Sequence, residues 1–126
     1  MKRVIFAALV LMVSITAMGQ ETMDDGSRVI LPLEVQQCDL PSAPAPIPGD
    51  PIKEDLLKAQ KNVKLFQAEM VTYRTCINQD TDSDALTSGN RLAITNAYNY
   101  TVDMEERVAQ MFNEAVRAFN DRQAKN

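Results

Sequence analysis

The sequence predicts an all-α protein: an antiparallel two-helix hairpin over residues 51–123 with an N-terminal proline-rich strap clipped by one disulfide. Two long segments space their apolar residues alternately by three and four positions, which is typical of helices that pack in pairs. A stretch rich in Asp, Ser, Thr and Gly, residues 80–89, separates the two segments and marks a turn. Helices joined by such a short turn pack antiparallel.

The amino terminus, residues 1–19, has the three parts of a secretory signal peptide. Lys2 and Arg3 form a basic start, 15 uncharged and largely apolar residues follow, and a small-x-small pattern ends at Gly19. A retained membrane anchor is the alternative, but a spanning helix needs about 20 apolar residues and this run is shorter. We therefore expect cleavage between Gly19 and Gln20, a mature chain without a membrane span, and a periplasmic or secreted location in a bacterium.

The charge of the mature chain argues against a nucleic-acid partner. Removal of Lys2 and Arg3 leaves 11 of the 13 basic residues beside 17 acidic ones, a net charge of −6. Nucleic acids and anionic membranes bind positive surfaces, so an acidic chain of this size binds them poorly.

The mature chain keeps two cysteines, Cys38 and Cys76. In an exported protein such a pair is typical of one structural disulfide. A metal site is one alternative, but it would require histidines or further cysteines, and the chain has no histidine. A redox pair is the other alternative, but it would have the spacing Cys-x-x-Cys. The sequence therefore predicts a Cys38–Cys76 disulfide.

The residues before the first helix divide into two segments. Residues 20–37 are polar apart from a short apolar patch, which predicts a flexible or loosely docked segment. Residues 38–50, the strap, hold four prolines, which forbid a helix and favour an extended polyproline conformation. In that conformation the strap spans about 37 Å, which matches the roughly 38 Å of a helix from Pro51 to Cys76. We therefore expect the strap to run back along the first helix.

The first helix should begin at Asp50 and Pro51, since Asp is a good N-cap and Pro suits the first helical position. It should end near Gln79. Its apolar seam comprises Ile52, Leu56, Ala59, Val63, Phe66, Met70, Tyr73 and Ile77.

The second helix should begin between Thr87 and Asn90 and run to about Arg122. Its inner seam comprises Ile94, Ala97, Thr101, Met104, Val108, Met111, Ala115 and Ala118. A second seam beside it comprises Tyr98, Val102, Ala109, Phe112, Val116 and Phe119. Glu105 interrupts this second seam.

Short motifs occur in a fixed order along the chain. They are Cys-x-x-Pro at Cys38–Pro41, Tyr-x-x-Cys at Tyr73–Cys76, and then Tyr98-Asn99, Phe112-Asn113 and Arg117-Ala118-Phe119. With this order the chain resembles a family of small exported proteobacterial proteins of uncharacterised function. Several of these proteins have a charged helix extension where this chain has its Asp-rich turn. The resemblance, over about 38–119, implies export, paired cysteines and a helical fold, and it implies no activity.

No pattern in the chain predicts catalysis or a cofactor. Asp80, Asp82 and Asp84 resemble the start of a calcium-binding loop, but Ala85 stands where the loop requires Gly and Arg91 where it requires Glu. The acidic pairs Glu54-Asp55 and Glu105-Glu106 are adjacent on helices, so their carboxylates diverge. We expect no enzyme activity, no cofactor and no metal site.

By elimination, the sequence predicts a non-catalytic interaction or structural protein of the bacterial cell envelope. A periplasmic chaperone-like or inhibitor-like binder of other exported proteins is the alternative. One seam of the second helix is enough to face the first helix, and the second seam is hard to bury fully in a lone hairpin, so it predicts an interaction face for a homodimer or an envelope partner. The face comprises Tyr98, Val102, Phe112, Val116 and Phe119. A wide core-facing helix, with this seam buried under the strap, is the other interpretation.

Overall fold

The computed structural model of the chain describes residues 21–79 and 83–126. The expected signal peptide over 1–19, its cleavage between Gly19 and Gln20, and the first acidic residues of the turn, 80–82, lie outside these ranges.

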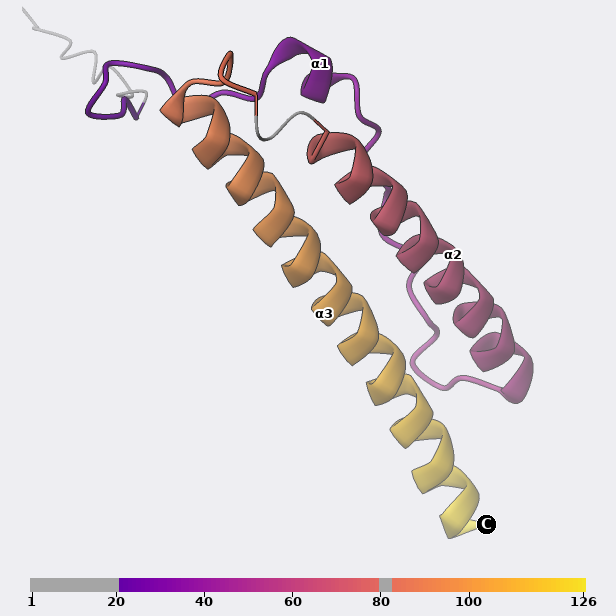
Figure 1. The fold of residues 1–126 in the computed structure, drawn as a ribbon. Coiled ribbons are helices and arrows are strands. Elements are labelled where there is room, and N and C mark those ends of the chain that lie inside the picture. The colour runs from indigo at the N-terminus through magenta and orange to yellow at the C-terminus, as the bar shows by residue number, and fades with distance from the viewer. Residues whose placement is uncertain (1–20, 80–82) are drawn as a thin grey trace, which may run out of the picture.

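Over the described residues the regular secondary structure is entirely helical (Figure 1). α1 is the single turn Leu33–Gln36, α2 is Lys53–Ile77, and α3 is Ser88–Lys125. The two long helices lie side by side along the whole length of α2. The predicted all-α class is confirmed for this part of the chain.

α2 begins later than the sequence suggested, and Asp50 is not its cap. Ile52 occupies the N-cap position, and its backbone N–H donates to the Asp55 carboxylate at 3.0 Å. The Asp50 carboxylate lies instead 3.6 Å from the guanidinium of Arg122, which also donates a hydrogen bond to the Pro51 carbonyl. The chain before α2 is thus fixed to the end of α3, so the capping role passes to Asp55.

α3 begins within the expected window and ends three residues beyond Arg122, at Lys125. Thr87 caps it: its hydroxyl accepts a hydrogen bond from the Asn90 N–H at 3.1 Å. The Asn90 side chain accepts one in return from the Thr87 N–H, also at 3.1 Å. This reciprocal arrangement satisfies two backbone donors that a helix end otherwise leaves unpaired.

The apolar seams of both helices form the core, in two clusters. At one end Val35, Tyr73, Ile77 and Ile94 pack together, and further along Phe66, Met70 and Val108 pack together. Most predicted seam positions are buried or half-buried. In the seam of α2 and the inner seam of α3 the exceptions are Ile52 and Met111, with exposed fractions of 55% and 42%, and Ala118, which is also exposed. Met111 and Ala118 lie on the flank of α3 that faces the strap rather than α2.

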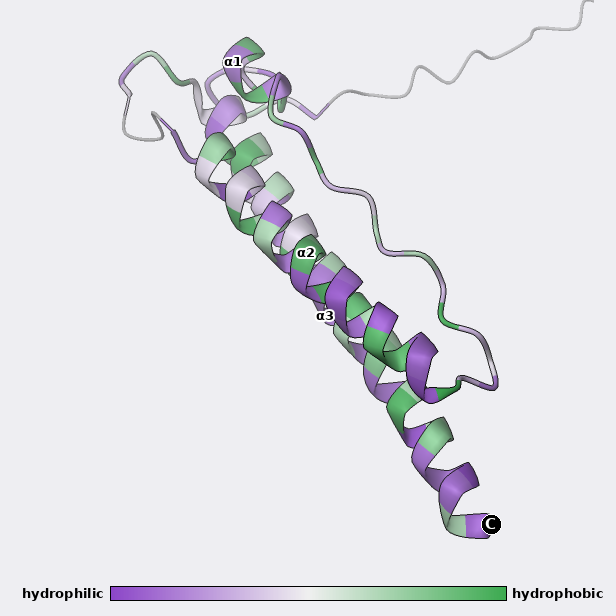
Figure 2. Ribbon diagram, turned by 90° about the vertical axis from the view of Figure 1, so that its right-hand side faces the viewer, coloured by the Kyte–Doolittle hydropathy of each residue, from purple (hydrophilic) through white to green (hydrophobic). Residues whose placement is uncertain are grey.

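The strap lies along one side of the helix pair, and Figure 2 shows it returning beside α2. Cys38, the first residue of the strap, forms a disulfide with Cys76 near the end of α2, with 5.8 Å between the two Cα atoms. The predicted disulfide is therefore present. Within the strap only Cys38, Pro41, Pro44 and Ile47 are half-buried, and all other positions are exposed. This spacing of three is the period of a polyproline helix, so one edge of the strap faces the helices.

Residues 21–37, which precede the strap, are docked on the end of the helix pair. Val35 belongs to the core and is only 6% exposed. The Ser27 hydroxyl accepts a hydrogen bond from the Gly89 N–H at 2.9 Å, and the Ile30 carbonyl accepts one from the Asn90 side chain at 2.7 Å. Of the two alternatives that the sequence left open, a flexible or a loosely docked segment, these contacts favour docking.

Candidate functional site

The five residues of the expected interaction face all lie on α3 and none is fully buried. Tyr98 and Val102 are 40% and 36% exposed, whereas Phe112, Val116 and Phe119 are half-buried. At 100° per residue, Tyr98, Val102 and Val116 lie on the flank opposite the one that meets the strap, and the two phenylalanines lie closer to α2.

An exposed surface therefore runs along the groove between α2 and α3 on the side away from the strap. We call it the open face, and it comprises Val71 and Arg74 of α2, Asn78 directly after α2, and Tyr98, Val102 and Glu105 of α3. Val71 is the most exposed apolar residue of the set, at 59%. Two recesses, of about 380 and 540 Å³, meet at Tyr98 and Asn78. Both are open to solvent, which suits contact with a partner surface better than enclosure of a substrate.

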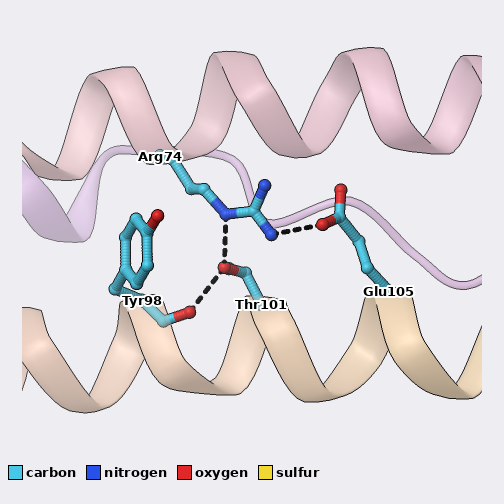
Figure 3. A network of polar contacts seen from close by, with 4 residues as sticks. All are labelled: Arg74, Tyr98, Thr101 and Glu105. Carbon is cyan, nitrogen blue, oxygen red and sulfur yellow. Dashed lines mark hydrogen bonds and ion pairs between the residues drawn. The ribbon is translucent and has the colours of Figure 1, made fainter.

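A polar network lies at the centre of the open face (Figure 3). Arg74 of α2 reaches across to α3, where its Nε donates to the Thr101 hydroxyl at 2.7 Å and its Nη2 to Glu105 Oε2 at 2.5 Å. The Thr101 hydroxyl in turn donates to the Tyr98 carbonyl at 2.6 Å. The Arg74 guanidinium also lies over the Tyr98 ring, with Cζ 5.4 Å from the ring centroid.

Burial makes this network important for the pairing of the helices. Thr101 is fully buried, and the side chains of Arg74 and Glu105 are only 17% and 25% exposed. A buried hydroxyl between two helices is costly unless it is hydrogen-bonded, and here it donates to the Tyr98 carbonyl on its own helix and accepts from Arg74 on the other. The network therefore explains why Glu105 interrupts an otherwise apolar seam: it is the partner of a cation on the other helix.

The sequence identified Tyr98, Thr101 and Glu105 as seam positions but missed Arg74. The signal that could have revealed it is Glu105 itself, since a carboxylate inside a helix seam requires a cation opposite. Which residue of α2 lies opposite Glu105 depends on the register of the two helices, and the sequence alone does not determine that register.

The titratable groups with perturbed pKa values lie away from the open face. Hydrogen bonds to the Asp25 carboxylate lower its pKa from 3.8 to about 2. The side chain and backbone of Ser27 donate the bonds with the largest effect, and Ser88 contributes less. Burial raises the pKa of Tyr73 in the core. In the described residues, no group of three or more His, Cys, Asp and Glu side chains could hold a metal ion.

The Asp-rich turn is described only from Ser83 onward. Arg91, which occupies the position of the bidentate Glu in a calcium-binding loop, donates a hydrogen bond to the Ser83 carbonyl at 2.9 Å. This contact gives Arg91 a structural role in holding the turn against α3.

None of the three described helices is both long and apolar enough to cross a membrane. No protein-family model, curated protein or solved structure matches the chain.

Proposed function

We propose that the protein is a non-catalytic interaction protein of the bacterial cell envelope, built as an antiparallel helical hairpin that binds a partner through its open face. The pairing of Arg74 with Glu105, and of Arg122 with the residues before α2, supports the hairpin arrangement. The Cys38–Cys76 disulfide supports an oxidising compartment, because such bonds persist in exported proteins.

The observation that carries the proposal is the difference between the two sides of the helix pair. The strap lies along one side, whereas the described chain leaves the other side uncovered (Figure 2). On that side Val71, Tyr98 and Val102 are more than a third exposed. Exposed apolar and aromatic residues grouped around a fixed ion pair are typical of protein-binding surfaces. The occupant is a second copy of the chain or another envelope protein.

Site-specific photo-crosslinking in living cells tests this proposal. A photoreactive amino acid at Val102 should capture one discrete adduct, because Val102 lies in the middle of the open face. The matched control is Gln110, which is exposed on the same helix and at 100° per residue points away from the partner helix. Equal capture from both positions, or none from Val102, would contradict an open-face partner. Many different adducts from Val102 would favour the chaperone-like alternative.

A further inference from the structure

The strap contacts the helix pair in the manner of a bound peptide. Its half-buried residues are every third one, Cys38, Pro41, Pro44 and Ile47. No hydrogen bond joins residues 39–49 to the rest of the described chain. An extended segment that binds by one polyproline edge, without backbone pairing, is how proline-rich ligands occupy grooves on other proteins.

The receiving surface is formed by both long helices. Near the start of the strap, Asp39, Pro41 and Ser42 border a recess whose other walls are Glu69 and Thr72 of α2. Near its end, residues 46–49 border a second recess whose walls include Met111, Ala115 and Ala118 of α3. Both recesses are open to solvent beside the strap. The strap thus occupies a shallow groove without filling it.

What keeps the strap in the groove is the attachment of its two ends. One end is the Cys38–Cys76 bond, and the other is held by Arg122, which contacts Asp50 and Pro51. A segment fixed at both ends has a high effective concentration over its site, so weak contacts along its length suffice to hold it. Removal of one attachment should lower its occupancy strongly.

We propose that the groove on the strap side is a binding site for extended proline-rich segments, and that the strap is its intramolecular occupant, retained by the Cys38–Cys76 bond. A dithiol reductant would open the site by thiol–disulfide exchange. One reductant thiolate attacks the disulfide and releases one cysteine as a thiolate, which takes up a proton. The second reductant thiolate then displaces the other cysteine, leaving two thiols on the protein and a disulfide on the reductant. This site lies opposite the open face and does not depend on the proposed function.

A labelled peptide tests the proposal. The probe is the sequence of residues 38–50 with Cys38→Ser, and its binding to the full mature protein is followed by fluorescence anisotropy. We expect at least tenfold tighter binding to the Cys38→Ser/Cys76→Ser protein than to the oxidised wild type, because the competing strap has lost one attachment. A probe with Pro44→Asp and Ile47→Asp should bind neither protein.

A second protein variant keeps the test decisive if loss of the disulfide impairs folding. Pro44→Asp/Ile47→Asp in the strap keeps the disulfide and weakens only the inward edge, so the unmodified probe should again bind at least tenfold more tightly. The matched control Ala43→Asp/Ala45→Asp adds the same charge to exposed positions and should behave as wild type. Failure of the probe to bind the Pro44→Asp/Ile47→Asp protein, with its helical circular dichroism unchanged, would overturn the proposal. Equal binding to both charge variants would overturn it too.

Discussion

Replacement of Arg74 tests whether the polar network stabilises the pairing of α2 and α3. Arg74→Ala removes two hydrogen bonds, to Thr101 and Glu105, and the contact with the Tyr98 ring. Hydrogen bonds to a charged group contribute about 1.5–3 kcal/mol, and an exposed cation–π contact adds about 0.5–1 kcal/mol. Since the pair is partly solvated, we expect a loss of about 2–3 kcal/mol in the free energy of unfolding.

Urea denaturation followed by circular dichroism measures this loss, and a double-mutant cycle identifies its origin. If Glu105 is unpaired after Arg74→Ala, then Glu105→Ala in the same protein should cost much less than it does alone, with a coupling of about 1–2 kcal/mol. The double replacement Arg74→Met/Glu105→Met should recover much of the lost stability, because two apolar groups leave no unpaired charge. A loss below about 0.5 kcal/mol for Arg74→Ala, typical of an exposed pair, would refute the reasoning.

Three further predictions concern the strap and the docked amino-terminal segment. Cys38→Ser/Cys76→Ser should lower the free energy of unfolding by about 4 kcal/mol, the chain-entropy value for a loop of 38 residues, measured by urea denaturation under oxidising conditions. Gly89→Ala should undock residues 21–31, because a Cβ there would lie 1.9 Å from the Arg28 carbonyl oxygen; limited proteolysis should then cut this segment faster. Because the pKa of Asp25 is lowered from 3.8 to about 2 in the folded state, its stabilising contribution is present above pH 4 and is lost as the pH falls from about 4 to 2; an NMR titration of its carboxyl should report the low value.

The glycine and aspartate predictions each have a matched control. Gly49→Ala should leave proteolysis unchanged, since a Cβ at Gly49 meets no atom within 4 Å. Asp25→Asn should remove part of the acid dependence of stability, whereas Asp24→Asn should not. An equal effect of the two glycine replacements would contradict the docking of residues 21–31 on α3, and an Asp25 pKa near 4 would contradict the hydrogen bonds of Ser27 to its carboxylate.

The strap and the core could be predicted from the sequence because simple geometry determines both. Twelve residues of a polyproline helix and about 25 residues of an α-helix have nearly the same length, so the returning strap brings Cys38 beside Cys76 at the far end of the first helix. The alternation of three and four residues likewise placed Phe66, Met70 and Val108 in the core. These features depend on local periodicity, which each segment carries in itself.

The docked amino-terminal segment and the polar network could not be predicted in this way, because each depends on residues distant in the sequence. Ser27 and Ile30 are ordered by Gly89 and Asn90, about 60 residues away. Nothing in the local sequence of residues 21–37 indicates that partner surface. The Arg74 contact depends in turn on the rotation and register of two helices.

The polar network also restricts what can cover the open face. Glu105 lies in the centre of an apolar seam and is still 25% exposed, and Arg74 beside it is 17% exposed. A flat apolar partner would remove the remaining water from this pair without offering hydrogen bonds, which adds the last part of the desolvation penalty of two ions. A partner that places a polar group at Glu105 while burying Val71, Tyr98 and Val102 avoids that cost. If the open face binds a partner as proposed, the apolar residues would supply the drive to associate and the Arg74–Glu105 pair would select which surface is accepted.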